Sequence, residues 1–295
     1  MSRKIDRLPG PVSKRPMKVI IASPSRSGTL GLYRAMQILG FKPYHSYECL
    51  FVHGVPHMEV EYEAVRAQHN RFSGIKRYDK ADFEKWFAEY DCLVEVPSFF
   101  GMAVLSAYAD DPNVKFILTE REPEKWVGSF NNTAGTLMKM ADSFPLVILR
   151  HFDRPLNLFL NLNQTICWAL SDKTNPGEPA NALAMRRNYV EYIEMAKRII
   201  PADRLCHIKL EDGLGWEQIC PFLDMPVPDQ EYPDRNEPAR FQAIVAEFIQ
   251  PMVTRAMVRF FTVAVPTIGV IGWAAVKYGP TVSAAVKKIP NSQMI

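Results

Sequence analysis

The sequence predicts an α/β fold of three layers, with a central parallel sheet between helices, followed by a C-terminal hydrophobic helix. Three observations predict it. Short β-branched apolar runs alternate with longer stretches of helical periodicity, a Gly-containing turn joins the first run to the first helix, and an apolar stretch without charges lies near the C-terminus. Alternating strands and helices favour a parallel sheet, because each crossover places a helix on one face of the sheet.

Length and composition limit the possible classes of protein. The chain has 295 residues, of which 47% are hydrophobic and 23% are charged, enough to bury one large core. A formal net charge of +3 is small for a dedicated nucleic-acid binder, so no nucleic-acid partner is expected. The five cysteines are odd in number and none has a Cys-x-x-Cys spacing. This pattern predicts neither disulfides nor a metal site, and it favours a reducing compartment.

Short apolar runs mark the expected strands. The first, Lys18-Val-Ile-Ile-Ala22, is β-branched and continuous, as in a strand that is buried on both faces. Glu122-Pro123 is a good helix start, because Pro suits the first helical position. Strands are expected at 18–22, 91–96, 114–119 and 205–210, and helices at 29–39, 58–70, 80–90, 99–109, from 122, within 131–170 and at 181–199.

Three parts of the chain differ in composition. Residues 1–16 are basic and rich in Pro, without the apolar run of a secretory signal, so a flexible tail is expected there. Residues 17–240 carry the alternating pattern and are expected to form the main domain. Residues 241–295 are expected to be helical, with a candidate membrane segment at 258–276.

The candidate membrane segment contains 17 residues without a charge, from Phe260 to Val276. This length is close to the lower limit of about 17 for crossing a bilayer. Arg259 and Lys277 flank the run, and Trp273 suits a membrane interface. We expect a membrane-associated protein with its main domain in the cytosol. The alternative is a soluble cytoplasmic protein in which this helix packs on the domain; a hairpin lying in the membrane interface is a further possibility.

The turn after the first strand, Pro24-Ser-Arg-Ser-Gly-Thr29, has the chemistry of a phosphate site. A helix N-terminus offers unpaired N–H groups and the positive end of a dipole. Glycine lets the backbone approach a phosphate closely, and arginine adds a bidentate charged contact. The alternative is an ordinary Ser/Gly turn before a helix. The candidate phosphate-binding residues are Arg26, Ser27, Gly28, Thr29 and Leu30.

This loop differs from that of nucleotide hydrolases. Their GxxxxGK[ST] motif places a Lys before the last hydroxyl residue, whereas here Thr29 follows Gly28 directly and the cation is Arg26. Magnesium-dependent phosphoryl transfer is therefore disfavoured, and the absence of GxGxxG after the first strand disfavours a redox cofactor. With its displaced cation, the loop resembles the 5′-phosphosulfate loop of P-loop sulfotransferases, P-[KR]-[ST]-G-[TS], although an extra Ser25 follows Pro24.

The resemblance implies a second element, an Arg at a strand end and a Ser eight residues later, that holds the 3′-phosphate of the donor. Arg121 follows the third expected strand, and Ser129 lies eight residues on, in the next helix. Open sheets bind ligands at the carboxyl ends of their strands, which suits Arg121. The alternative is an ion pair of Arg121 with Glu122 or Glu124, with Ser129 on the surface.

The resemblance also implies a base at the end of the second core strand, two residues before a Pro, and Glu95 occupies that position. Burying an unpaired carboxylate is costly, so either a role as general base or an ion pair with Arg26 or Arg121 accounts for it. The segment 211–236 resembles a sulfotransferase-like group common in fungi, through its GW-x-x-[IL]-C-x-F-L-x-x-P-x-P pattern. Asn236 is a further candidate site residue there.

The resemblance implies transfer of a sulfuryl group from 3′-phosphoadenylyl sulfate (PAPS) to a hydroxyl of a small, apolar acceptor. Glu95 and Arg26 would be the catalytic residues, with neither metal nor redox cofactor. The acceptor pocket is expected from 99–105 and 131–170, with an aromatic lining of Phe130, Phe144, Phe152 and Trp168. The alternatives are a non-catalytic nucleotide-binding or membrane-tethered scaffold protein, or a P-loop enzyme with other small-molecule chemistry. The sequence does not indicate an oligomeric state.

Overall fold

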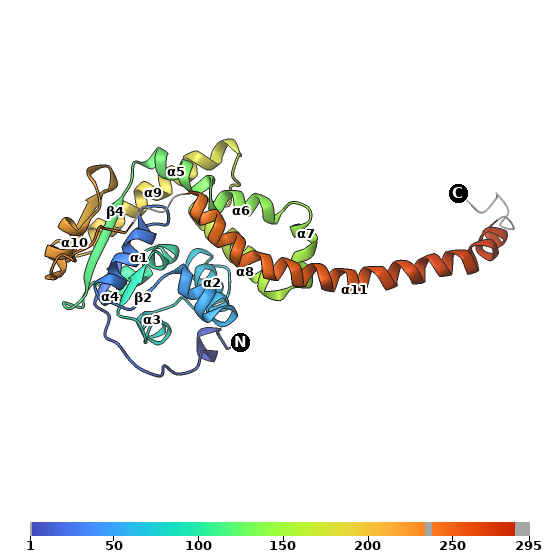
Figure 1. Ribbon diagram of the computed structural model, residues 1–295, viewed down its shortest axis with the longest axis horizontal. Helices are drawn as coiled ribbons and strands as arrows, with labels where there is room; N and C mark the ends of the chain where they lie inside the picture. Colours follow the sequence, from blue (N-terminus) through green and yellow to red (C-terminus); the bar gives the residue numbers. More distant parts are fainter. Residues whose placement is uncertain (1, 234–237, 287–295) are drawn as a thin grey trace.

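The centre of the molecule is a parallel five-stranded sheet (Figure 1). The computed structural model describes residues 2–233 and 238–286. The strand order is β2-β3-β1-β4-β5, so the first strand lies in the middle of the sheet. The α/β class with a central parallel sheet is therefore confirmed. The strands are β1 (Val19–Ile21), β2 (Pro43–Tyr44), β3 (Cys92–Val94), β4 (Lys115–Glu120) and β5 (Leu205–Lys209).

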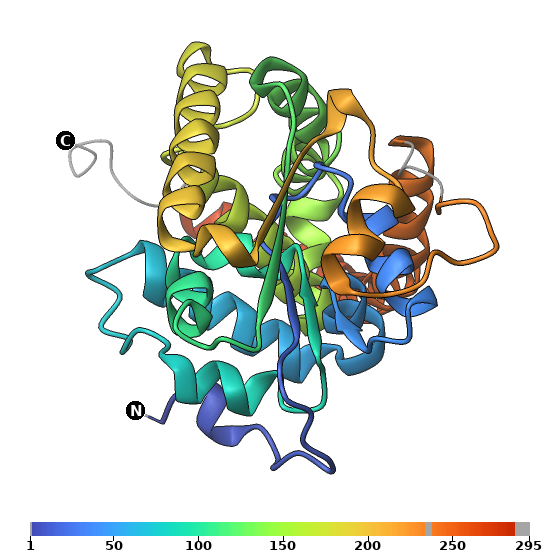
Figure 2. The same ribbon diagram turned by 90° about the vertical axis from the view of Figure 1, so that its left-hand side faces the viewer.

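The α-helices cover both faces of this sheet (Figure 2). Local signals fix several of their ends. The carboxylate of Glu122 accepts the N–H groups of Glu124 and Lys125 ahead of Pro123, which confirms the predicted helix start. The helices are α1 (Thr29–Ile38), α2 (Val55–His69), α3 (Lys80–Trp86), α4 (Ala103–Tyr108), α5 (Pro123–Asn131), α6 (Ala134–Ala141), α7 (Leu146–Leu149), α8 (Arg154–Leu170), α9 (Pro179–Ile199), α10 (Trp216–Leu223) and α11 (Pro238–Val286).

Alternating side chains along each strand divide the interior into two cores. Val19 and Ile21 of β1 belong to a smaller core with α1 and α10, whereas Ile20 belongs to a larger core with α2, α8 and α9. On β4, Ile117 joins the smaller core and Phe116 the larger one. Because successive side chains of a strand point to opposite faces, this division gives the three layers that the sequence predicts.

One strand was missed by the sequence analysis. β2 consists of Pro43 and Tyr44 alone, which pair with Cys92 and Leu93 at the edge of the sheet. Two residues show no alternation or apolar run, so periodicity gives no signal for such a strand. β2 leads into a π-helical turn, Glu48–His53, and both lie next to the candidate site described below.

The expected flexible tail at 1–16 is not what the structure shows. Ile5 is buried in the larger core, and a short helical turn spans Ile5–Arg7. Arg3 forms an ion pair with Asp82 on α3, with a distance of 2.6 Å between Nη1 and Oδ2. Three of the basic residues that suggested a solvated tail, Arg3, Lys4 and Arg15, are therefore partners of acidic groups on the domain.

The first part of α11 belongs to the globular domain. Ile249, Met252 and Ala256 are buried in the larger core, since their spacing places them on one face of the helix. Arg255 Nε and Arg259 Nη1 lie 3.1 and 3.2 Å from one carboxylate oxygen of Asp153, which is fully buried. The domain thus extends beyond the boundary at 240 that the sequence pattern suggested.

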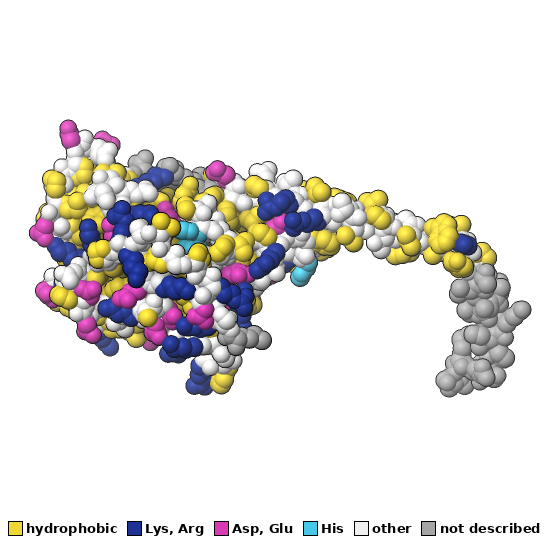
Figure 3. Space-filling view, turned by 90° about the horizontal axis from the view of Figure 1, so that it is seen from below, with side chains coloured by type: hydrophobic (Ala, Val, Ile, Leu, Met, Phe, Trp, Pro, Cys, Tyr) yellow, Lys and Arg dark blue, Asp and Glu magenta, His cyan; other side chains and the backbone are white. Residues whose placement is uncertain are grey.

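Beyond Phe260, α11 extends away from the domain (Figure 1). Its apolar side chains are exposed around the helix, and Val265, Ile268 and Trp273 are each more than half exposed. Figure 3 shows these apolar side chains along the arm, and basic side chains where the arm meets the domain. By length and composition, Val245–Pro280 is a helix that is able to cross a bilayer.

Candidate functional site

The phosphate loop, residues 23–28, connects β1 to α1 in the middle of the sheet. Arg26 and Gly28 both have left-handed backbones, with φ of +70° and +82°. Gly28 is the N-cap of α1 and no side chain caps this end, so the first-turn N–H groups, which lack partners within a helix, lie at the loop. The left-handed backbone of Gly28 favours glycine, and a Cβ there would also make a tight contact of 3.1 Å with the Leu214 side chain.

Hydrogen bonds from Thr119 on β4 and Trp126 on α5 stabilise the conformation of this loop. The N–H of Thr119 donates to Ser23 Oγ at 2.8 Å, and Thr119 Oγ1 donates to the carbonyl oxygen of Ser27 at 2.5 Å. The indole N–H of Trp126 donates to the carbonyl oxygen of Ser25 at 2.7 Å. These partners are distant in sequence, so the loop conformation depends on the assembled sheet.

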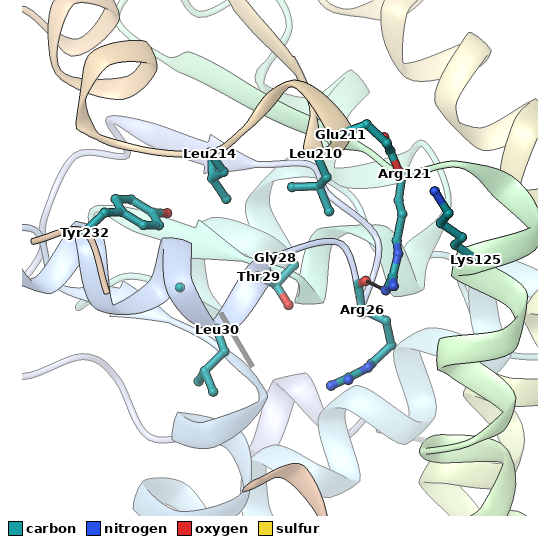
Figure 4. A pocket seen from close by; sticks show the side chains of 11 residues that line it. Arg26, Gly28, Thr29, Leu30, Arg121, Lys125, Leu210, Glu211, Leu214 and Tyr232 are labelled. Carbon is teal, nitrogen blue, oxygen red and sulfur yellow. Dashed lines mark hydrogen bonds between the residues drawn. The ribbon is translucent and has the colours of Figure 1, made fainter. Parts of the chain in front are cut away.

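A cavity of about 280 Å³ lies against the loop (Figure 4). Three basic side chains line it, those of Arg26, Arg121 and Lys125, together with Glu211 and the first turn of α1, and we call it the cationic cavity. Arg121 Nη1 also donates to the carbonyl oxygen of Arg26 at 3.1 Å. Three cations and a helix N-terminus around one cavity suit an anion with more than one phosphate group.

Lys125 was missed by the sequence analysis. It lies four residues after Arg121, in the first turn of α5, and it lines the same cavity. Residues four apart at the start of a helix can lie on the same side of it. The positive end of the helix dipole disfavours the charge of a Lys in the first turn, unless an anion lies nearby. That spacing is the signal that could have identified it.

Two predicted residues lie differently from expectation. The Ser27 side chain is fully buried and is not part of the cavity lining, and its N–H donates to the carbonyl oxygen of Pro24 at 3.2 Å. Ser129 Oγ accepts a hydrogen bond from Arg26 Nε at 3.3 Å. The structure therefore places Ser27 inside the loop and Ser129 behind Arg26, as a residue that orients the guanidinium.

The alternative pairing of Arg121 with neighbouring carboxylates is not seen among the described residues. Glu122 caps α5, and Glu124 forms an ion pair with Arg186 at 2.6 Å. The Tyr189 hydroxyl instead accepts from the N–H of Arg121 at 2.7 Å and donates to its carbonyl oxygen at 3.0 Å. These contacts fix the backbone at the end of β4 and leave the Arg121 guanidinium directed to the cavity (Figure 4).

Glu95 follows β3 and is buried beside the phosphate loop. Its backbone is left-handed, with φ of +68°. Thr29 Oγ1 donates to Glu95 Oε2 at 3.1 Å, and His45 Nε2 lies 2.5 Å from the same oxygen. His45, which follows β2, therefore forms the close ion pair that the sequence alternative assigned to Arg26 or Arg121, while the charges of Arg26 and Glu95 also interact.

His45 is held in one orientation. Its Nδ1 accepts the N–H of Tyr47 at 3.1 Å, so the proton of a neutral ring lies on Nε2, which faces Glu95. The carboxylate of Glu48 accepts both the N–H of His45, at 2.9 Å, and the hydroxyl of Tyr33, at 2.5 Å. One ion pair and two hydrogen bonds thus connect Glu95 through His45 and Glu48 to Tyr33 of α1.

The pKa shifts of His45 and Glu95 favour an ion pair between them. Burial opposes ionisation of both groups, but the charge and contact of Glu95 raise the pKa of His45 above its ordinary value. Burial likewise opposes the charge of Glu95, whereas His45, Ser25 and Thr29 together lower the pKa of Glu95 below its ordinary value. Both shifts point to an ionised Glu95 next to a protonated His45.

An apolar cavity of about 110 Å³ lies on the other side of Glu95. Ser25, Glu61 and Glu95 are polar residues of its lining, and most of the rest is apolar. The larger apolar side chains that line it are Leu50, Phe99, Phe130, Leu137, Phe159, Leu162, Ile166 and Val245. The predicted ranges 99–105 and 131–170 do contribute to this cavity, through Phe99 and through α6 and α8.

The predicted aromatic lining is correct at one position of four. Phe130 lines the cavity. Phe144 is 81% exposed, and Phe152 packs against Phe260 of α11 with ring centroids 5.3 Å apart. The Trp168 indole donates to Asn175 at 3.2 Å, away from this cavity. Helical spacing placed these rings on helices, but it did not show which helix face meets the site.

Glu61 was not a sequence candidate. It lies on α2, is 2% exposed and lines the apolar cavity. Burial raises the pKa of Glu61 to about 7; the charge of Glu95 adds to this effect, whereas the Cys49 thiol and His45 oppose it. A carboxyl group that titrates near neutral pH inside a cavity is a candidate functional group.

The segment 211–236 contributes to both the core and the site. Trp216 and Cys220 are buried in the smaller core, while Leu214 and Tyr232 line the cationic cavity (Figure 4). Asn236, a candidate from the sequence, lies outside the described residues.

Comparison with known proteins gives a family match over most of the chain. Residues 18–241 match the family model of the sulfotransferase domain. The "Ava biosynthesis cluster protein M" of Aspergillus versicolor is 33% identical over 220 residues, which are 74% of this chain and 80% of that protein. The crystal structure of a sulfotransferase from Alicyclobacillus acidocaldarius has a TM-score of 0.39 at 14% identity, covering 82% of this chain and 94% of that chain.

The buried Glu61 predicts a pH dependence of stability. Its pKa in the folded state, about 7, exceeds the ordinary value of 4.5, so the folded state binds more protons than the unfolded state between these values. Stability should therefore fall as pH rises from 4.5 towards 7, by up to ~3 kcal/mol for this group. In Glu61→Gln this part of the loss should be absent, as measured by urea unfolding at pH 5 and pH 8. An identical pH dependence in both proteins would contradict the assignment.

Proposed function

Since this chain belongs to the sulfotransferase family, we propose that it transfers a sulfuryl group from PAPS to a hydroxyl of a small, apolar acceptor. One observation carries the proposal. The cationic cavity and the apolar cavity meet at the Thr29–Glu95 hydrogen bond, since Thr29 lines the first and Glu95 lines the second. A donor and an acceptor bound in these cavities would have their reacting ends at this contact.

The residues of the cationic cavity fit the donor. Gly28, Thr29 and Leu30 present the start of α1 to its 5′-phosphosulfate, together with Arg26. Arg121, with Lys125 beside it, is suited to the 3′-phosphate, because guanidinium and ammonium groups at one place stabilise a dianion. PAPS would supply the sulfuryl group; the protein supplies positioning and charge.

Glu95 is placed to accept the proton of the acceptor hydroxyl. An ionised carboxylate is required for this role, and His45 favours that state through its 2.5 Å contact. Arg26, close enough for its charge to interact with that of Glu95, would stabilise negative charge that develops on the leaving phosphate. The left-handed backbone at Glu95 is the kind of local strain that is retained at functional sites.

We further propose that α11 anchors the protein in a membrane with the catalytic domain in the cytosol. The helix is long and apolar enough, and its apolar side chains beyond Phe260 have no protein surface to cover them in the described structure. Arg255 and Arg259 lie where the exposed part of α11 leaves the domain. Near its other end, Lys277 Nζ lies 4.6 Å from the centre of the Trp273 ring, a pairing suited to a membrane–water interface. A soluble cytoplasmic protein is the alternative.

Nucleotide binding tests the donor site. Adenosine 3′,5′-bisphosphate should bind the wild type, and Arg26→Ala or Arg121→Ala should each weaken binding by about 1.5–3 kcal/mol, the contribution of a charged hydrogen bond. Arg186→Ala, which removes an exposed cation of α9, is the matched control and should bind like the wild type. Isothermal titration measures all four, and no binding to wild type at millimolar nucleotide would refute the donor assignment.

Catalysis tests Glu95. Glu95→Gln keeps the shape of the side chain but removes the base, so turnover should fall by about 10²–10⁴ while nucleotide affinity stays close to wild type. Glu120→Gln, which changes a carboxylate at the end of β4 that contacts Lys197 and His207, is the control. Unchanged turnover in Glu95→Gln would make Glu95 structural. Nucleotide binding without any transfer would favour the non-catalytic alternative.

Deletion of residues 263–295 tests the anchor. This cut keeps Arg255, Arg259 and Phe260, which contact the domain, and removes most of the exposed apolar helix. Full-length protein should resist carbonate extraction from membranes, whereas the truncated protein should be soluble and retain its melting temperature. If the full-length chain is soluble and the truncated chain aggregates, the helix packs on the domain and the anchor is wrong.

A further inference from the structure

Glu61 differs from the other buried carboxylates of the described chain in lacking a strong partner. Its Oε2 is buried without a hydrogen-bond partner, and the neighbour that bonds the carboxyl group is the Cys49 thiol, a weak donor. The others have strong partners: Glu48 has Tyr33 and the His45 N–H, Asp82 has Arg3, Asp91 has Arg15 and the Lys42 N–H, Glu95 has His45, and Asp153 has Arg255 and Arg259.

A buried carboxylate without a partner destabilises the fold, so a structural role does not explain Glu61. Replacing it with an apolar residue would remove that cost. The group instead lines the apolar cavity that Glu95 also lines. An unsatisfied acceptor on a residue that lines a cavity indicates a ligand that satisfies it.

The charges around the cavity indicate which ligand group would bind. Glu61 and Glu95 are the carboxylates of its lining, and among the described residues the lining contains no Lys or Arg. His45 already balances Glu95 at 2.5 Å. Glu61 is thus the carboxylate that still lacks a countercharge, and in an apolar surrounding a cation gains more from it than a neutral donor does.

We propose that Glu61 binds an ammonium group of the acceptor, so that the acceptor is an amine whose hydroxyl reaches Glu95 and whose apolar middle fills the cavity. The inference rests on the proposed function and names its substrate class. The rings of Phe99, Phe130 and Phe159 provide the apolar wall. A bound ammonium also keeps Glu61 ionised.

A matched pair of phenols tests this. Tyramine and 4-ethylphenol share ring, hydroxyl and two-carbon chain, and differ in the ammonium group. The measurement is isothermal titration of each into full-length protein saturated with adenosine 3′,5′-bisphosphate, at pH 8, where the pKa of about 7 leaves Glu61 ionised. Tyramine should bind at least ~10-fold more tightly, the size expected for one charged hydrogen bond.

Variants on α2 test whether Glu61 is the residue responsible for the preference for tyramine. Glu61→Gln should remove the preference for tyramine, and Glu61→Asp, which keeps the charge, should retain part of it. Glu59→Gln removes a carboxylate of the same helix that contacts Lys4 and Arg154 outside the cavity, and should keep the full preference. Equal affinity of the two phenols in wild type, a preference that survives in Glu61→Gln, or no binding of either phenol would each overturn the proposal.

Sulfate transfer is measured separately, with radiolabelled PAPS and the same two phenols. A preference for tyramine without transfer would support the subsite and refute the proposed reaction. Transfer to 4-ethylphenol as efficient as transfer to tyramine would support the reaction and refute the subsite. The two proposals can therefore fail independently.

Discussion

The parallel direction of the five strands is the constraint on which the site depends. Because all strands run the same way, their carboxyl ends lie at one edge of the sheet, and the residues that follow them meet there. The phosphate loop follows β1, His45 follows β2, Glu95 follows β3, Arg121 follows β4 and Glu211 comes shortly after β5. No two of these segments are neighbours in sequence. The phosphate loop lies in the middle because β1 does, so groups from both sides of the sheet reach it.

Within this arrangement, Arg26 connects the loop after β1 to α5 and to the end of β4. Its guanidinium is oriented by Ser129, and its carbonyl oxygen accepts a hydrogen bond from Arg121. The backbone at Arg26 is left-handed, which costs roughly 1–2 kcal/mol for a non-glycine residue. Such strain persists only where the surroundings hold it, here through Thr119 and Trp126. A chain with a net charge of only +3 thus concentrates positive charge at one point.

The sequence predicted what depends on local pattern and missed what depends on contact across the sheet. The position of the loop between β1 and α1 could be predicted because strand, glycine and helix are consecutive, and the position of Arg121 because it follows a strand with clear apolar character. His45 could not, since it follows a two-residue strand and meets Glu95 fifty positions further on. The N-terminal residues were misassigned for the same reason, because Asp82, the partner of Arg3, is far along the chain.

The apolar cavity beside Glu95 and the exposed apolar arm share α11. Val245 lines the apolar cavity, and together with Leu137 it also borders an open apolar groove of about 630 Å³ between α11 and α6–α7. From Val245 to Phe260, where the exposed part begins, the helix rises by about 22 Å. Asp153 fixes this part of the helix by binding Arg255 and Arg259, so the arm cannot move freely relative to the cavity. If the exposed part of α11 enters a bilayer, the apolar cavity therefore lies close to the membrane surface. The groove continues from Val245 along α11 as far as Val253, on the way to the exposed part of the helix. An amphiphilic acceptor, with an apolar body and polar ends, would be concentrated at that surface.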